Sequence, residues 1–323
     1  MALTHRIVAA NGIRIHVVEE GAGPLVLMIH GFPESWYSWR HQIRALADTG
    51  FRAAAIDVRG YGRSSKPAAI DAYRMLAHVG DNLGVVTALG AESAIIVGHD
   101  WGSPIAATSA LLRPDVFPAV ALLSVPYSAG SRTRPTEAFR AMGGSEEFYI
   151  CYFQEPGRAE AEAEEDVRRW VLGFLIAASG DAVPPADGGT IASVPAGGKL
   201  RDRFMFPDAL PSWLTEDDVD VYAGEFERTG FSGALNRYRN VDRDWEDLAV
   251  WAGRPITVPS LFIGGEWDGP TRWGAGAIAR FAETLPALRG SHILPGCGHW
   301  VQQERAEEVN RLLVEFVKGV ALG

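Results

Sequence analysis

The residues with the clearest chemical meaning are Gly98-His99-Asp100-Trp101-Gly102, which directly follow the apolar run Ala94–Val97. Glycines on both sides of an aspartate permit a sharp, strained turn that lifts the central side chain out of a sheet, and a following helix directs free backbone N–H groups back at that side chain. A turn in which Asp100 only caps a helix would explain the aspartate but not both glycines. The motif therefore predicts a nucleophile elbow with Asp100 as the nucleophile.

An aspartate nucleophile restricts the chemistry of such a site. A carboxylate can displace a group at a saturated carbon and form an alkyl ester, and water can then attack the ester carbonyl, which belongs to Asp100, and regenerate the acid. The second step requires an oxyanion hole and a base. We predict that the backbone N–H groups of Phe32, in the loop His30–Pro33, and of Trp101 form the oxyanion hole.

The base is expected to be a histidine in a loop after a late strand. His299 satisfies this expectation, because the segment Gly296–Trp300 follows the apolar run His292–Leu294. An acidic residue that orients His299 should also follow a strand, and both Glu266 and Asp268 stand just beyond the run Leu261–Ile263. The chain order nucleophile, acid, histidine is the order of the α/β-hydrolase fold.

Short apolar runs in the first 131 residues predict the elements that position these side chains. Two alternating segments around Asn11-Gly12 are typical of a β-hairpin with a tight turn. Buried strands are expected next, each followed by a loop and a helical segment, at Leu25–Ile29, Ala53–Ile56, Ala94–Val97 and Val120–Leu123. Helices are predicted at Trp36–Ala47 and Ala72–Leu89. This alternation predicts a mostly parallel sheet with helices on both faces.

The pattern changes from about Ser131, where helical segments follow one another without buried strands between them. The segment Gly180–Lys199 is rich in Gly, Pro and Ala and shows no apolar periodicity. Strand-like runs return at Ser260–Ile263 and His292–Leu294, and an amphipathic helix is predicted at Glu304–Val317. We therefore predict an α/β core in two parts, residues 1–131 and 254–323, with an inserted helical cap over residues 132–253.

The combined motifs resemble those of soluble epoxide hydrolases of the α/β-hydrolase fold, and the resemblance covers nearly the whole chain. Four segments carry it: His30-Gly31-Phe32-Pro33, Gly98-His99-Asp100-Trp101-Gly102, Tyr149-Ile150-Cys151-Tyr152-Phe153-Gln154-Glu155-Pro156-Gly157 and Asn236-Arg237-Tyr238-Arg239-Asn240. The resemblance implies an enzyme that converts an epoxide and water to a vicinal diol. This sequence has Arg237 where the family often has Trp.

The resemblance also implies roles for residues of the cap. Two cap tyrosines would donate hydrogen bonds to the epoxide oxygen while Asp100 attacks a ring carbon from the opposite side. These donors fall on Tyr149 and Tyr238, with Tyr152 as the alternative to Tyr149. The resemblance further implies Asp268, rather than Glu266, as the partner of His299. A neutral phenol suits this role because ring opening places negative charge on oxygen.

Several aromatic residues near these motifs are candidates for the walls of an apolar substrate pocket, although packing in the core would explain them equally well. These candidates are Phe32, Trp36, Trp101, Tyr152 and Trp300.

Composition excludes other classes of function. The chain has 323 residues and a formal net charge of −10, with no basic cluster for nucleic acid. No apolar run approaches the ~20 residues of a membrane helix, and the start of the chain lacks a secretory signal. With only Cys151 and Cys297, a reduced, cytoplasmic compartment is expected.

No metal-ligand spacing or nucleotide-binding loop is present, so we expect no metal and no cofactor. The sequence leaves the oligomeric state open, a homodimer included.

Two rival functions fit part of the pattern. A haloalkane dehalogenase would use the same Asp100, oxyanion hole and His299, and the indole of Trp101 could bind a leaving halide, but it would not need both tyrosines. A catalytically inactive binding protein would have no use for a strained nucleophile turn.

Overall fold

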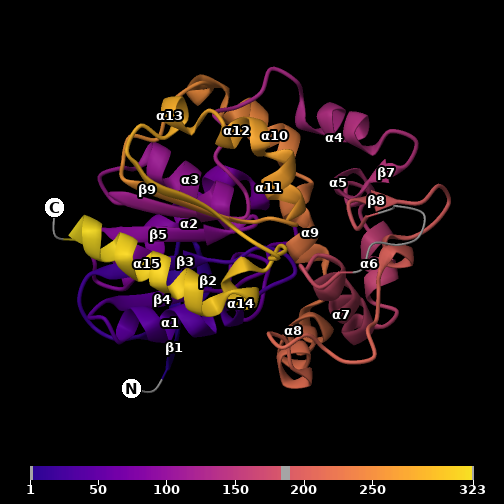
Figure 1. The fold of residues 1–323 in the computed structure, drawn as a ribbon, viewed down its shortest axis with the longest axis horizontal. Helices are drawn as coiled ribbons and strands as arrows, with labels where there is room; N and C mark the ends of the chain where they lie inside the picture. The colour runs from indigo at the N-terminus through magenta and orange to yellow at the C-terminus, as the bar shows by residue number, and fades with distance from the viewer. Residues whose placement is uncertain (1–2, 183–189, 322–323) are drawn as a thin grey trace.

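The structure is a computed structural model that describes residues 3–182 and 190–321. Its described residues form one eight-stranded sheet with helices on both faces (Figure 1). The strands are β1 (Thr4–Ala10), β2 (Ile13–Glu20), β3 (Leu25–Ile29), β4 (Arg52–Ile56), β5 (Ala94–His99), β6 (Ala119–Leu123), β9 (Ser260–Gly265) and β10 (Leu288–Leu294).

The spatial order of the strands is β1-β2-β4-β3-β5-β6-β9-β10. The first two strands are antiparallel, and β2 is also antiparallel to β4, whereas β4, β3, β5, β6, β9 and β10 run parallel. The predicted hairpin is present, and its turn residues Asn11 and Gly12 have φ values of 48° and 76°. Positive φ at both turn residues matches the twist of the flanking strands.

The sheet buries both faces, as the near-continuous apolar runs predict for parallel strands. In β3, Leu25, Leu27 and Ile29 enter one hydrophobic cluster, which continues into the cap, and Val26 and Met28 enter the cluster on the opposite face. This alternation follows from the two-residue period of a strand. The sheet therefore packs between two apolar layers, and this packing fixes the positions of the loops that follow its strands.

Helices of the core cover both faces of the sheet. They are η1 (Trp36–Trp39), α1 (Arg40–Ala47), η2 (Ile70–Tyr73), α2 (Met75–Ala88), α3 (Gly102–Leu112), α11 (Gly269–Trp273), α12 (Ala275–Ile278), α13 (Phe281–Thr284), α14 (Val301–Glu304) and α15 (Ala306–Ala321). The structure has a separate short helix at the start of each of the three helices predicted in the core. These short helices are η1 before α1, η2 before α2 and α14 before α15. The helix predicted at Glu304–Val317 begins at Ala306, because Arg305 has a non-helical backbone that separates α15 from α14.

A second group of helices contains most of the residues between β6 and β9. Its elements are α4 (Pro135–Gly143), β7 (Glu147–Phe148), α5 (Tyr149–Tyr152), α6 (Arg158–Ala163), α7 (Val167–Ala177), β8 (Ser193–Val194), η3 (Leu200–Arg203), α8 (Glu216–Thr229), α9 (Ser232–Tyr238), α10 (Val241–Asp247) and η4 (Ala249–Trp251). Its first members, α4 to α7, lie at the right of Figure 1, whereas α9 and α10 lie nearer the centre, next to the core. The strands β7 and β8 form a small antiparallel pair.

The pair β7–β8 was not expected from the sequence, since two-residue strands carry no detectable periodicity. Part of the predicted irregular segment Gly180–Lys199, residues 183–189, lies outside the described residues. The bounds of the cap, residues 132–253, stay a prediction. In the part of the chain that the structure describes, no helix is both long and apolar enough to cross a bilayer.

Candidate active site

The elbow at Asp100 is built from backbone contacts that only glycine allows. Asp100 stands between β5 and α3 with a φ of 50°, in the left-handed region that L-residues rarely adopt. A Cβ atom on Gly98 would lie 2.0 Å from the carbonyl oxygen of Gly102, and one on Gly102 would lie 1.9 Å from that of Ile29. The two glycines of the motif are therefore required by close packing, and the strained residue between them carries the carboxylate.

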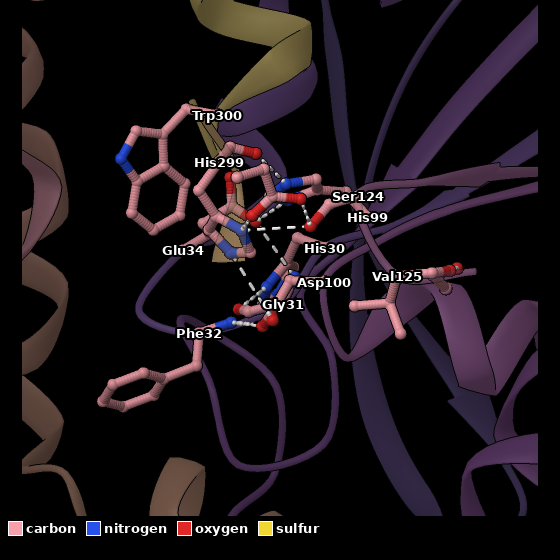
Figure 2. A network of polar contacts seen from close by, with 12 residues as sticks. His30, Gly31, Phe32, Glu34, His99, Asp100, Ser124, Val125, His299 and Trp300 are labelled. Atoms are coloured by element: carbon pink, nitrogen blue, oxygen red, sulfur yellow. Dashed lines mark hydrogen bonds and ion pairs between the residues drawn. The ribbon is translucent and has the colours of Figure 1, made fainter. Parts of the chain in front are cut away.

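The two oxygens of the Asp100 carboxylate face different groups (Figure 2). The backbone N–H of Phe32 donates to Oδ1 at 2.8 Å, and the imidazole Nε2 of His299 lies 3.5 Å from Oδ2. The chain passes so close that a Cβ atom on Gly31 would lie 2.2 Å from Oδ1. Phe32 thus holds the position predicted for an oxyanion-hole donor, while Trp101, the predicted second donor, is the N-cap residue of α3.

Asp100 is buried, with 7% of its surface exposed. Burial alone would raise the pKa of this carboxyl group. The hydrogen bond from His299 and its charge, followed by the charge of His99 and the N–H of Phe32, instead lower that pKa below its usual value. Asp100 is therefore ionised at neutral pH, as a nucleophile must be.

His299 is oriented by Asp268. The Nδ1 atom of His299 lies 2.8 Å from Oδ1 of Asp268, and Asp268 is fully buried. The other oxygen of Asp268 accepts hydrogen bonds from the hydroxyls of Ser124 and Thr271, each at 2.7 Å. Glu266 instead accepts a hydrogen bond from the backbone of Gly296 at the exposed surface. The structure thus places Asp268, and not Glu266, against His299.

Two carboxylates determine the charge of His299. Burial alone would lower the pKa of this imidazole, but the charge of Asp268 and the hydrogen bonds to Asp100 and Asp268 raise it well above its usual value. The resting site therefore holds an imidazolium between two carboxylates.

A second buried histidine lies beneath the elbow. The Nδ1 atom of His99 is 2.8 Å from Oε2 of Glu34, and its Nε2 atom is 2.8 Å from the carbonyl oxygen of His299. Since a carbonyl oxygen only accepts, Nε2 of His99 is the donor of the hydrogen bond to His299. The pair is fully buried and connects the oxyanion loop to the loop of His299, because Glu34 also accepts from the N–H of Gly31.

Tyr149 and Tyr238 approach the same site from the cap. Tyr149 begins α5 and Tyr238 ends α9, and their ring centroids are 6.1 Å apart. Burial, with the negative charge of Asp100, raises the pKa of both phenols far above the usual value. Both hydroxyls are therefore neutral donors at physiological pH.

A cavity of about 790 Å³ opens over these groups. Its lining includes the proposed catalytic residues, namely Asp100, Tyr149, Tyr238, Asp268 and His299. Phe32, Phe174, Met205 and Trp273 are among the apolar residues of its wall. A largely apolar cavity with a few convergent polar groups is typical of a small-molecule site.

Four aromatic residues expected in the pocket wall do not line this cavity. Trp36 contacts His5 and Tyr37 at another part of the molecule. The hydroxyl of Tyr152 donates to Glu162 at 2.6 Å, so Tyr152 points away from Asp100. These positions correct the assignments of Trp36 and Tyr152, because side-chain direction was not visible in the sequence.

The other two aromatic residues support the site from behind. Trp300 is fully buried, packs against the ring of His299 and donates its indole N–H to Leu175. Trp101 contacts the ring of Tyr238, with ring centroids 5.1 Å apart. Their predicted contact with substrate is thus replaced by contact with two candidate catalytic residues.

Four polar residues of this site were not predicted from the sequence. Ser124 comes directly after β6, and Glu34 comes a few residues after β3. Polar residues just beyond the carboxyl ends of parallel strands often belong to a binding site, so this position could have indicated both residues. Thr271 lies close to Asp268 in the sequence, and Glu304 lies close to His299. This proximity in sequence was not enough to predict that either residue belongs to the site. Among the described residues, no cluster of three His, Cys, Asp or Glu side chains has the arrangement of metal ligands.

Comparisons with known proteins identify the family of the chain. Residues 24–150 match the family model of the alpha/beta hydrolase fold. The chain is 45% identical to epoxide hydrolase B and 45% identical to epoxide hydrolase A, both of Mycobacterium tuberculosis. Each of these matches covers 99% of this chain and 99% of the relative. The solved structure of an epoxide hydrolase from an endophytic Streptomyces superposes with a TM-score of 0.97 at 64% identity, covering 99% of this chain and 97% of that one.

The fold and the match therefore define a hydrolase of the α/β-hydrolase fold, as the sequence predicted. More narrowly, the chain belongs to the epoxide hydrolase family, in which an aspartate nucleophile is the general mechanism.

Proposed function

We propose that this protein hydrolyses a small apolar epoxide to a vicinal diol through an ester on Asp100. The observation that carries the proposal is the position of one carboxylate. Asp100 lies between a backbone donor at Oδ1 and an imidazole at Oδ2, and it shares its cavity with the two phenols of Tyr149 and Tyr238. The names of the relatives support the same substrate class.

The geometry assigns each oxygen of Asp100 a role in the first step. Because Oδ1 is held by Phe32, Oδ2 is the oxygen free to attack an epoxide carbon. Its electron pair forms the C–O ester bond as the ring C–O bond breaks, and Tyr149 or Tyr238 gives its proton to the epoxide oxygen while the other phenol donates a hydrogen bond. Oδ1 becomes the carbonyl oxygen of the ester.

The second step uses His299. The imidazolium of His299 first returns a proton to the phenolate left by the first step, which restores the tyrosine and leaves a neutral imidazole. The neutral His299 then takes a proton from water as the water oxygen attacks the carbonyl carbon of the ester, and the N–H groups of Phe32 and Trp101 stabilise the charge that develops on Oδ1. Collapse of this intermediate breaks the bond between the carbonyl carbon and Oδ2. Oδ2 leaves in the diol and takes the proton of the new carboxyl group, which restores the carboxylate of Asp100. Asp268 keeps the imidazole oriented and stabilises its positive charge. The reaction consumes one water and needs no metal or cofactor.

Isotope labelling tests the covalent route. In water labelled with oxygen-18, a first turnover at excess enzyme should give diol without label, because its new oxygen comes from Asp100. Repeated turnover should then place label in the Asp100 peptide. Asp100→Ala should form no diol, whereas Asp115→Ala, at an exposed aspartate, should behave as wild type. Labelled diol in the first turnover would contradict the ester and indicate direct attack by water.

A haloalkane dehalogenase remains the alternative function for the same nucleophile. The structure favours epoxide opening, since Tyr149 and Tyr238 line the cavity and Trp101, the expected halide ligand, does not. A panel of aryl and alkyl epoxides assayed beside chloro- and bromoalkanes separates the two. Halide release without diol formation would favour the dehalogenase.

We further propose a reduced, cytoplasmic setting for the protein. Cys151 and Cys297 both carry free thiols, and burial raises the pKa of each. The substrate is the one partner that the site requires, and a homodimer is compatible with this chemistry.

A further inference from the structure

The loop that carries His299 is held by a carboxylate that the proposed mechanism does not use. Glu304, the last residue of α14, is buried, with 8% of its surface exposed. Its carboxylate accepts the backbone N–H groups of Gly298 at 2.8 Å and of Trp300 at 2.9 Å, the residues on either side of His299. One side chain therefore fixes the backbone before and after the base.

The same carboxylate also reaches the cap. Glu304 accepts the backbone N–H of Gly180 at 2.9 Å, and Gly180 follows the end of α7. The backbone N–H of His299 in turn donates to the carbonyl oxygen of Ala178 at 2.9 Å. One hydrogen bond thus joins the segment Ala178–Gly180 directly to the loop of His299, and a second joins it to that loop through the carboxylate of Glu304.

Close packing makes this junction specific. A Cβ atom on Gly180 would lie 2.4 Å from the carbonyl oxygen of Gly296, and one on Gly298 would lie 2.2 Å from the backbone nitrogen of Gly180. Both contacts are with backbone atoms, which cannot move aside as a flexible side chain can. The cap segment Ala178–Gly180 also lines the substrate cavity. A single segment therefore touches the space for substrate and the backbone of the base.

We propose that Glu304 is a positioning residue that joins the cap to His299 and controls hydrolysis of the ester rather than its formation. The proposal rests on the proposed function. Glu304 does not line the cavity, so it acts only through the loop that it holds. Ester formation needs Asp100 and the tyrosines, whereas hydrolysis also needs His299 at the correct distance from a water molecule. A small displacement of the base should therefore slow the second step selectively.

Glu304→Gln is the first test, because it keeps the shape of the side chain but replaces one acceptor oxygen with an NH₂ group that faces backbone donors. Rapid mixing with excess enzyme and an aryl epoxide, followed by acid quench and intact-protein mass spectrometry, measures both steps. We expect the hydrolysis rate constant to fall about tenfold to a hundredfold. The rate constant of ester formation should stay within about threefold, so ester should accumulate. Glu308→Gln, at an exposed glutamate of α15, is the matched control and should match wild type.

Gly180→Ala tests the junction from the cap side and decides the question if Glu304→Gln fails to fold. Its Cβ should push the cap segment away from Gly296 and give the same selective loss of hydrolysis. A merely structural role would lower the amount of active enzyme without changing the ratio of the two rate constants. An unchanged ratio in the folded variants would overturn the proposal. Absence of any ester in His299→Gln, under conditions where wild type turns over, would instead contradict the proposed function itself.

Discussion

The imidazole Nε2 of His299 lies 3.5 Å from Oδ2 of Asp100, while the opposite oxygen of the same carboxylate accepts the N–H of Phe32. The base is thus next to the nucleophile rather than bonded tightly to it. This arrangement keeps His299 close to the carboxyl carbon of Asp100, which water attacks in the proposed mechanism.

His299→Gln should separate the two steps. Glutamine cannot take a proton from water, but it leaves Asp100 and the tyrosines in place, so the ester should form and persist. General-base catalysis contributes about 10²–10⁴ in rate, and hydrolysis should fall by that factor. Intact-protein mass spectrometry after addition of an epoxide should show the mass of one substrate added. No adduct, under conditions where wild type turns over, would contradict attack by Asp100.

The pH dependence of hydrolysis should reflect the two carboxylates beside His299. In the resting enzyme Asp268 and Asp100 raise the pKa of His299, which keeps it protonated. Ester formation removes the charge of Asp100, so the pKa of His299 falls and the neutral base becomes available. The hydrolysis rate constant should therefore rise with pH and level off at a lower pH than the one at which His299 of the free enzyme titrates.

Single-turnover kinetics across pH, beside an NMR titration of His299 in the free enzyme, measures both quantities. Asp268→Asn should shift the kinetic midpoint to lower pH still, since it removes the remaining negative charge. A hydrolysis rate that does not vary with pH would show that His299 is not the base.

Tyr149→Phe and Tyr238→Phe should each slow ester formation. Each phenol is a neutral donor that lines the cavity and, in the proposed mechanism, binds the epoxide oxygen. Loss of one should therefore slow ester formation about tenfold or more, with a larger loss in the double variant. Tyr152→Phe is the matched control, since its hydroxyl binds Glu162 and not the cavity. It should retain ester formation. Efficient chloride or bromide release by the double variant would favour the dehalogenase.

Arg237 should contribute to the stability of the protein. Its guanidinium is buried, pairs with Asp244, donates to the carbonyl of Tyr73 and lies 4.8 Å from the centre of the Trp101 ring. Asp244 in turn accepts the N–H of Met75 at the start of α2. The ion pair therefore ties the cap helices α9 and α10 to the core.

Arg237→Met should reduce the free energy of unfolding by about 3–5 kcal/mol, because it leaves the buried carboxylate of Asp244 without its cation. Asp244→Asn keeps an acceptor for Met75. The double variant should therefore lose less than the sum of the two single losses. Urea unfolding of all four proteins measures this difference. Additive losses would show that the pair does not act as a unit.

The sequence predicted most of the core because its signals are local. Strands such as Leu25–Ile29 are buried on both faces, which gives unbroken apolar runs, and the elbow at Asp100 needs two glycines at fixed spacing. Asp268 and Glu266 could not be separated by spacing, since both follow the same strand and the path of the loop decides which one is buried. Only the resemblance of the chain to soluble epoxide hydrolases favoured Asp268 over Glu266.

By itself the sequence predicted the candidate nucleophile and base and determined the parallel sheet and the family, because each depends on a few neighbouring residues. Only the tertiary structure showed that Tyr152 points away from the cavity and that Glu304 binds Gly180, 124 residues earlier in the chain. The physical reason is the same in both cases. Side-chain direction and contacts between distant segments depend on how helices pack against the sheet, and no local pattern of residues records that packing.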